Sequence, residues 1–220
     1  MSSELTLYSY WRSSAAYRVR IALGLKGLAY RQVPVHLVKD GGQQHADEYR
    51  ALNPQELVPL LVDDANGGVR IAQSLAILEY LDEVFPVPAL LPADPAQRAQ
   101  VRALALHIAC DIHPLNNLRV LQYLSVELGA DDEAKNAWYR HWVEKGLAAV
   151  EEGLAVLKGG LSLGNRPGYL EACVIPQLYN ARRFSCDLQG LSRLLEMEDR
   201  CLALDVFKDA SPEVQPDVVA

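Results

Sequence analysis

The sequence predicts an α/β domain followed by an all-helical domain. Strand-like and helix-like patterns alternate through the first 85 residues. Four prolines then fall between Phe85 and Pro95, a density typical of a domain linker. Beyond them the periodicity is helical, with no clear strand pattern. We therefore assign residues 1–85 to the first domain, 86–94 to a linker and 95–220 to the helical domain.

The first domain begins with a β-α-β order. The segment "ELTLYSY" (residues 4–10) alternates with a period of two, which predicts a strand. Helical sequence follows and ends at Gly27, a residue suited to the left-handed position after a helix. The segment "YRQVPVHL" (residues 30–37) predicts a second strand, in which Pro34 favours a sheet edge or a bulge. A loosely helical segment, "QQHADEYRAL", comes next.

Two further strands and a helix complete the first domain. Branched residues predict a strand over residues 58–62, and an Asn-Gly-Gly turn at 66–68 leads to a strand over 69–72. The segment "QSLAILEYLDEVF" (residues 73–85) has apolar residues at helical spacing, and Ser74 is a suitable N-cap. The whole order predicts a compact α/β domain.

The second domain contains at least four helical segments. Asp94 and Pro95 have the order of an N-cap and a first-turn proline, and they precede the helical "AQRAQVRALALHIAC". The segment "NAWYRHWVEKGLAAVEEGLAVLKGG" predicts a long helix ended by Gly159 and Gly160. Two more helices are predicted over "EACVIPQLYNARRF" and "LSRLLEMEDRCLALDVF". We expect the tail from Ser211 onward to be mobile.

Composition and charge exclude several classes of protein. Half of the 220 residues are hydrophobic and 22% are charged, as in ordinary globular proteins. The net charge of -7 and the lack of Lys/Arg-rich runs argue against nucleic-acid binding. No targeting segment or membrane span is evident, so we expect a cytoplasmic protein. Four cysteines lack metal-binding spacing, and we expect reduced thiols and no metal site at Cys110, Cys173, Cys186 and Cys201.

The segment "RSSAAYRVR" places Ser13 and Ser14 where the chain passes from the first strand into the first helix. Serine is a good N-cap, because its oxygen accepts from an otherwise unpaired amide of the first turn. The same amides and the helix dipole also attract anions. The local pattern leaves open whether these serines only cap the helix or also bind a ligand.

Seven segments in order resemble the zeta class of the cytosolic glutathione transferases, the group that contains maleylacetoacetate isomerase and maleylpyruvate isomerase. They are "RSSAAYRVRIALGLKG", "VHLVKDGGQQ", "LNPQELVPLL", "QSLAILEYLDE", "LLPADP", "DIHPLNN" and "NARRF". The resemblance covers nearly the whole chain. It implies the glutathione transferase fold, in which a thioredoxin-like domain precedes a helical domain, with glutathione as cofactor. Members of the family are usually homodimers.

The resemblance also implies a reaction. It is the glutathione-dependent cis-trans isomerisation of maleylacetoacetate or maleylpyruvate, small dicarboxylates with a cis double bond, in aromatic-compound catabolism. Two alternatives stay open. One is conjugation of glutathione to small α-halo acids, and the other is a glutathione-transferase-like interaction module without catalysis.

By resemblance, Ser13 donates a hydrogen bond to the glutathione sulfur, assisted by Ser14 and the neighbouring amides. A thiol with a pKa of about 8.5 needs about 2.7 kcal/mol of preferential anion stabilisation to lower that pKa by about two units. A helix dipole and one hydroxyl donor together reach this order of magnitude. Tyr8 or Tyr10 could serve the sulfur instead, as in other classes, but the spacing fits the serine type better.

The resemblance assigns further glutathione contacts in the first domain to three places. Val58 precedes Pro59, which is implied to be a cis-proline that turns the preceding backbone toward a peptide. Gln73 and Ser74 begin a helix whose N-terminus would bind the γ-glutamyl carboxylate. Gln43 would reach the glycyl end. An edge-strand proline, a simple helix cap and a solvated loop glutamine are the structural alternatives.

Two arginines match the zeta pattern for the second substrate. Arg12 and Arg183 would bind the carboxylates and the transient enolate, since guanidinium groups do so bidentately. Arg119 and Arg182 are weaker candidates, and a solvated role is common for any single arginine. His113 and Asn117 match positions that approach glutathione in relatives, although a histidine before a proline can equally be structural.

The chain departs from the zeta pattern at two places. Ala15 replaces a cysteine that usually follows the two serines. Because the reacting sulfur would belong to glutathione, this change need not abolish activity, and maleylpyruvate-specific relatives also lack the cysteine. Gly168 and Glu171 replace the Thr and Asp of a capping box, so we expect the side-chain cap to be lost at a cost of about 1 kcal/mol.

Overall fold

The computed structural model describes residues 4–157 and 160–218, and these fall into two compact units. The first unit comprises Met1–Leu90 together with Leu202–Ala220, and the second comprises Leu91–Cys201. From sequence we assigned Leu202–Ala220 to the helical domain. Their contacts group them with the first unit instead.

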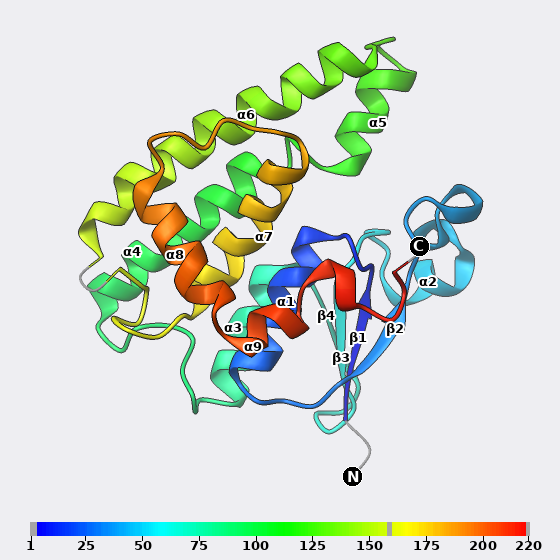
Figure 1. Ribbon diagram of the computed structural model, residues 1–220. Helices are drawn as coiled ribbons and strands as arrows, with labels where there is room; N and C mark the ends of the chain where they lie inside the picture. The colour runs from blue at the N-terminus through cyan, green and yellow to red at the C-terminus, as the bar shows by residue number, and fades with distance from the viewer. Residues whose placement is uncertain (1–3, 158–159, 219–220) are drawn as a thin grey trace. The chain divides into compact units, whose positions relative to one another are not determined.

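The first unit contains a four-stranded sheet of order β2-β1-β3-β4 (Figure 1). Strand β1 is parallel to β2, and the β1–β3 and β3–β4 pairs are antiparallel. Strand β2 lies at an edge, one of the two places that Pro34 favoured, and it ends at Pro34 rather than extending through residue 37 as predicted. The bounds are β1 Leu5–Ser9, β2 Arg31–Pro34, β3 Leu60–Asp63 and β4 Val69–Ala72.

Helices α1 and α3 pack against each other in this unit. The glycine after α1, Gly27, has φ of 65°, which confirms the predicted left-handed helix end. The α-helices are α1 Ser14–Leu25, α2 Asp47–Leu52, α3 Ser74–Val84 and α9 Asp205–Asp209, and the short 3-10 turns are η1 Lys39–Gly41, η2 Gln43–His45 and η5 Pro212–Val214.

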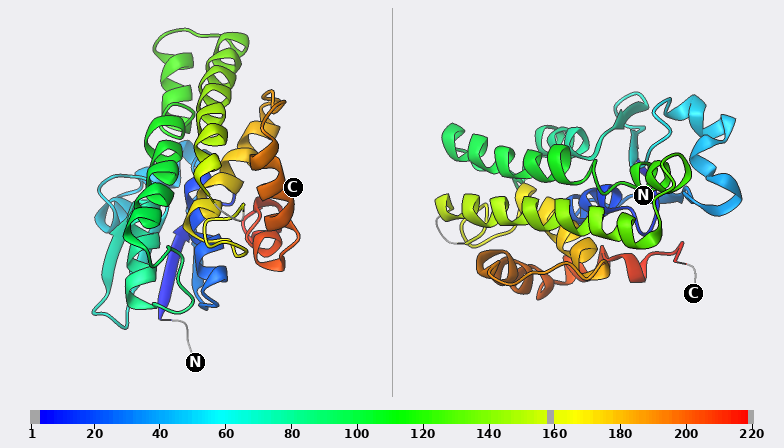
Figure 2. Two further views of the ribbon diagram at one scale, coloured as in Figure 1. Left: turned by 90° about the vertical axis from the view of Figure 1, so that its left-hand side faces the viewer. Right: turned by 90° about the horizontal axis from the view of Figure 1, so that it is seen from above.

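The second unit is helical in its described part, apart from two isolated β-bridges between residues 161 and 166. Figure 2 shows α4, η3 and α5 following one another alongside the long α6. Asp94 caps α4 as predicted, because its carboxylate accepts from the Gln97 amide at 2.9 Å. The bounds are α4 Pro95–Leu106, the π-helical η3 His107–Ile112, α5 Leu118–Val126, α6 Asp132–Gly153, η4 Leu154–Val156, α7 Tyr169–Arg183 and α8 Ser192–Leu202.

Helix boundaries differ from the predictions at three places. Helix α6 begins earlier, because Asp131 caps it, and it ends at Gly153 rather than at the predicted glycines, of which Gly159 lies outside the described residues. The pattern predicted as one C-terminal helix is divided into α8 and α9. The π-helical turn η3 was not predicted. It packs on α6 where Gly146 leaves no room for a side chain, since a Cβ there would lie 2.4 Å from Ile112.

The sequence predicted that α7 loses its side-chain cap. Gly168 indeed provides no side-chain acceptor, but Glu171 does cap the helix, so the prediction is wrong on this point. The longer side chain of Glu171 reaches back to accept from the Gly168 amide at 2.7 Å. Its carboxylate also accepts from the amide of Ser162 at 2.7 Å and from the Ser162 hydroxyl at 2.5 Å. The glycine contributes no side chain, so one carboxylate supplies the whole side-chain cap.

The described part of the tail, residues 211–218, is attached to the first unit rather than mobile as predicted. Gln215 is buried, and its amide donates to the carbonyls of Asp209 at 3.0 Å and Ser211 at 2.8 Å. Asp217 accepts from the backbone amide of Trp11. Within the described ranges, no helix combines the length and apolar character needed to cross a membrane.

Candidate active site

The sheet register brings four loops of the first unit to one edge. Tyr8, near the end of β1, pairs with Val33 of β2 and with Leu60 at the start of β3. Leu60 also pairs with Ala72 at the end of β4. The loops that follow β1, β2 and β4 and the loop that precedes β3 therefore leave the sheet together. Most of the predicted glutathione contacts lie on these loops.

An apolar cluster lies beneath these loops. Its buried members come from the loops after β1 and β2, from α2 and from the segment before β3, which are far apart in sequence. They are Tyr10, Val35, Tyr49 and Val58, with Tyr8, Trp11, Leu37 and Leu52 packed against them. The cluster therefore packs the loops after β1 and β2, helix α2 and the segment before β3 against one another.

Ser13 is the N-cap of α1, and its Oγ accepts from the Ala16 amide at 3.2 Å. A serine hydroxyl has one proton and two lone pairs, so this bond leaves the O–H able to donate to another group. Ser13 is partly exposed, whereas Ser14 is buried. The cap and the donor role proposed from sequence are therefore compatible in one side chain, and Ser13 is the more accessible of the two serines.

Arg12 lies in a tight turn that leads into α1. The turn is closed by a hydrogen bond from the Ser13 amide to the Tyr10 carbonyl at 2.9 Å. The Arg12 guanidinium stacks over the Trp11 ring at 4.3 Å, and its buried Nε has no hydrogen-bond partner in the described part of the chain. Ala15 is the second residue of α1 and is partly exposed.

The Val58–Pro59 peptide bond is cis, as the resemblance implied. Val58 lies outside the β3 ladder, which begins at Leu60. The preceding carbonyl, of Leu57, accepts from the Tyr49 hydroxyl at 2.6 Å and from the side-chain amide of Asn53 at 2.8 Å. Burial raises the pKa of Tyr49 to about 12, so this phenol remains a donor at neutral pH. Sequence reasoning missed both of these supporting side chains.

The predicted N-cap of α3 is wrong by one residue. Gln73 is the N-cap, and Ser74 is the first helical residue. Gln73 has φ of 71°, a left-handed conformation that is uncommon outside glycine and occurs often at functional sites. Its side chain donates to Gln55 at 2.6 Å and does not cap the α3 amides. This helix start is therefore open to an external acceptor.

Arg18 contributes a positive charge at the same place. It lies in α1, only 2% exposed, and donates to Ser74 Oγ at 3.2 Å. A cation next to a helix N-terminus adds to the dipole that attracts a carboxylate. Sequence reasoning did not select this residue. The available indication was a charged residue within the otherwise apolar segment "AAYRVRIAL".

Gln43 has a structural role in the loop after β2. Its Oε1 accepts from the His36 amide at 2.8 Å, which closes the loop, while the residue stays exposed. The His36 ring contacts the Tyr10 ring at 4.9 Å. Gln43 is thus connected to the loop after β1, and its contact with a glycyl carboxylate stays a prediction.

In the second unit, His113 and Asn117 lie together. Their Nε2 and Nδ2 atoms are 3.3 Å apart. Asn117 is also the N-cap of α5, because its Oδ1 accepts from the Arg119 amide at 3.2 Å. The bond uses the backbone of Arg119, whose side chain is exposed.

The neighbouring arginines of α7 have different surroundings. Arg182 forms an ion pair with Glu198, and this hydrogen bond raises the pKa of Arg182. Arg183 is exposed and stacks over the Phe184 ring at 4.9 Å. Arg182 already neutralises a carboxylate, and Arg183 is the arginine of this pair that matches the zeta pattern.

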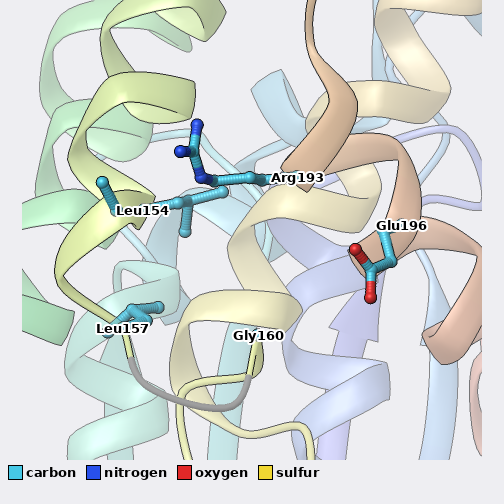
Figure 3. A pocket seen from close by; sticks show the side chains of 6 residues that line it. Leu154, Leu157, Gly160, Arg193 and Glu196 are labelled. Atoms are coloured by element: carbon cyan, nitrogen blue, oxygen red, sulfur yellow. The ribbon is translucent and has the colours of Figure 1, made fainter.

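A pocket in the second unit lies near the end of α6 (Figure 3). Arg193 and Glu196 of α8 line it together with Leu154 and Leu157. None of the candidate residues belongs to this lining, and Arg193 already pairs with Glu151. We therefore assign it no role in the site.

Comparisons with known proteins agree with this geometry. Residues 3–83 match the glutathione S-transferase N-terminal domain. The chain is 53% identical to a probable maleylacetoacetate isomerase of Vibrio cholerae, over 97% of this chain and 98% of that protein. It is also similar to the holo structure of maleylpyruvate isomerase, a bacterial zeta-class glutathione transferase, with TM-score 0.91, 44% identity, and 97% and 100% coverage.

A third relative has glutathione in its active site. It is the maleylacetoacetate isomerase of Anaeromyxobacter dehalogenans, with TM-score 0.86, 42% identity and 98% coverage of both chains. The fold is that of a glutathione transferase. With near-complete coverage at these identities, the chain belongs to the zeta class of that family.

Proposed function

We propose that this protein is a glutathione-dependent isomerase that converts maleylacetoacetate or maleylpyruvate to the fumaryl isomer. The observation that carries the proposal is the start of α1, where the partly exposed Ser13 hydroxyl lies next to the first-turn amides and can donate to an anion. The relatives named for these two reactions, at 45% to 53% identity over nearly the whole chain, support the choice of substrate class.

The first task of the site is to keep glutathione ionised. The Ser13 hydroxyl donates to the sulfur, while its lone pair caps Ala16. The dipole of α1 adds to this, and the first turn of the helix carries no acid that would oppose the thiolate. Together these effects reach the roughly 2.7 kcal/mol that shifts the thiol pKa by about two units.

The thiolate then acts on the cis double bond. A C–S bond forms at one alkene carbon, and the alkene electron pair moves into the conjugated carbonyl as an enolate. Rotation about the resulting single bond follows. Collapse of the enolate re-forms the double bond in the trans geometry and expels the thiolate, so glutathione is regenerated. Arg12, whose Nε lacks a partner in the described chain, is proposed to stabilise the carboxylate and enolate charge, together with Arg183.

The remaining glutathione contacts are proposed from the geometry of the first unit. The Val58 backbone lies outside the sheet ladder and would pair with the tripeptide. The γ-glutamyl carboxylate would lie at the start of α3, near Gln73, Ser74 and the buried Arg18. Gln43 is proposed for the glycyl end, and His113 and Asn117 for further contacts on the strength of the family pattern.

An assay with both maleyl substrates tests the proposal. The purified protein is incubated with each substrate, with and without glutathione, and the loss of the dienolate absorbance is followed. We expect isomerisation only in the presence of glutathione. Absence of isomerisation of both substrates would contradict the proposal, and comparison of kcat/KM would identify the preferred one.

The same protein preparation separates the two alternatives. Conjugation of small α-halo acids would release halide in a glutathione-dependent manner without isomerase activity. A non-catalytic module would show neither reaction. The open amides at α1 and α3 favour a glutathione-binding enzyme over such a module.

We further propose that the enzyme acts as a homodimer in the cytoplasm, in the breakdown of aromatic compounds. The family pattern supports this. Light scattering after size-exclusion chromatography measures the oligomeric state, and a mass near 24.3 kDa would contradict the dimer.

A further inference from the structure

The C-terminal segment of the chain packs along α1. Helix α9 approaches α1 at Gly24, where an added Cβ would lie 2.3 Å from a methyl group of Val206. Nearby, the buried Tyr17 hydroxyl donates to the Phe207 carbonyl at 3.3 Å. These contacts place the end of the chain beside the helix that begins at Ser13.

Arg20 connects this segment to the loop after β1. The side chain is 1% exposed, and its Nε donates to the Ala210 carbonyl at 2.9 Å. Its other nitrogens donate to Ser9 Oγ at 3.3 Å and to the Trp11 carbonyl at 3.1 Å. Although burial lowers the pKa of Arg20 to about 10, the guanidinium is still charged at neutral pH.

Asp217 also bonds to Trp11, the residue whose carbonyl accepts from Arg20. Its Oδ2 accepts from the Trp11 amide at 2.9 Å, and its Oδ1 accepts from Gln32 at 3.3 Å. Both polar backbone groups of Trp11 are thus bonded outside the turn, the N–H to Asp217 and the carbonyl to Arg20. The two partners are 206 and 9 residues away in sequence, so neither bond is a consequence of the turn itself.

Trp11 immediately precedes the two residues to which we assign the chemistry. It lies inside the turn closed by Ser13 and Tyr10, and its ring supports the Arg12 guanidinium. We propose that the C-terminal tail, through Asp217 and with Arg20, is a positioning element that sets the orientation of Arg12 and Ser13. The inference rests on the proposed function, because it takes these two residues as the catalytic pair.

The consequence is a catalytic effect from a residue that touches no substrate. Hydrogen bonds to charged groups are stronger than neutral ones, and here two of them fix a single residue of the turn. Without Asp217 the Trp11 amide would lose its acceptor, and the turn could move. Misplacement of reacting groups by about 1 Å can cost about 100-fold in rate, so a partial loosening should be readily measured.

Three variants of the full-length protein test the positioning role. Asp217→Ala removes the acceptor, Asp217→Asn keeps one carbonyl oxygen for the Trp11 amide, and Asp209→Asn is a matched control. Asp209 lies in the same C-terminal segment, but its side chain is exposed. The measurements are kcat and KM for isomerisation, the pKa of bound glutathione from the ultraviolet thiolate absorbance, and the melting temperature.

We expect Asp217→Ala to lower kcat about tenfold and to raise the pKa of bound glutathione, with a smaller change in KM. Asp217→Asn should recover most of both losses, and Asp209→Asn should resemble the wild type. Unchanged kcat and thiolate pKa in Asp217→Ala, with only a lower melting temperature, would overturn the proposal, since the tail would then only fasten the fold.

Two provisions keep the test decisive. If Asp217→Ala does not fold, Asp217→Glu replaces it, because the extra methylene displaces the carboxylate while keeping its charge; the same two readouts should change in the same direction. The thiolate titration uses glutathione alone. It therefore decides the positioning role even if the wild type isomerises neither maleyl substrate, a result that would contradict only the proposed function.

Discussion

The N-termini of α1 and α7 differ in what satisfies their amides. At α7, the carboxylate of Glu171 accepts from the Gly168 amide and from two groups of Ser162, and it is completely buried. At α1, Ser13 satisfies one amide, no acidic residue lies in the first turn, and the cap is partly exposed.

The difference shows how one local structure can serve stability or function. A helix start attracts negative charge in either case. At α7 the chain supplies the acceptor from its own third helical residue, so the site is closed. At α1 the chain supplies a neutral hydroxyl, and the charge is left to a ligand. Substitutions that alter one helix start at a time separate these two roles.

Removing the internal carboxylate should have the largest effect. Glu171→Ala leaves three buried donors without an acceptor, and we expect the free energy of unfolding to fall by about 3 to 5 kcal/mol. Urea denaturation at neutral pH measures the loss. The folded fraction should keep its affinity for glutathione. A decrease below about 1 kcal/mol would mean that the cap at α7 is not important for stability.

Removing the hydroxyl at α1 should affect chemistry more than stability. Ser13→Ala should lower kcat/KM about 100-fold, corresponding to about 2.7 kcal/mol, because the thiolate loses its donor. The lost cap should cost only about 1 kcal/mol of stability. Ser14→Ala is the matched control and should have the smaller effect, since Ser14 is buried. Equal losses in the two variants would contradict the assignment of Ser13.

The buried carboxylate should also give stability a recognisable pH dependence. Burial raises the pKa of Glu171 above its usual 4.5, although its hydrogen bonds oppose this. The unfolded chain therefore loses this proton at a lower pH than the folded chain does. The contribution of Glu171 to stability is then greatest in acid and decreases as the pH rises from about 4.5 through the raised folded-state pKa.

Comparison with Glu171→Gln isolates this contribution, because the amide does not titrate. The free energy of unfolding is measured for the wild type and for Glu171→Gln from pH 4 to 8. As pH increases, the value for the wild type should fall relative to that of Glu171→Gln. A difference that moves in favour of the wild type with increasing pH would show that its hydrogen bonds outweigh burial.

The smallest effect should come from restoring the family cysteine at the second residue of α1. Ala15→Cys adds a thiol beside the glutathione sulfur but changes no donor of the proposed mechanism. We expect kcat/KM for each maleyl substrate to change less than about threefold. A larger change, confined to one of the two substrates, would identify this position as a determinant of substrate choice.

Much of the fold and part of the site could be predicted from sequence, because they depend on local patterns. Alternation, branched residues and a turn signal identified all four strands, and Asp94 and Gly27 were assigned correctly to their helix ends. The serine pair was placed correctly at the start of α1. Ser74 was predicted as the N-cap of α3, but Gln73 holds that position and Ser74 accepts from the distant Arg18. The prediction for the cap of α7 failed because it overlooked the reach of the longer Glu171 side chain to the Gly168 amide.

Sequence patterns were sufficient to predict the order of the elements in the first domain, the position of Ser13 at a helix start and the family. These follow from residue types at short spacing, which act within a few residues. Only the tertiary structure decided that the loops converge at one edge of the sheet, that Arg18 lies at the start of α3 and that Asp217 bonds to Trp11. Such contacts join segments up to 206 residues apart, and they form only when the core has brought those segments together.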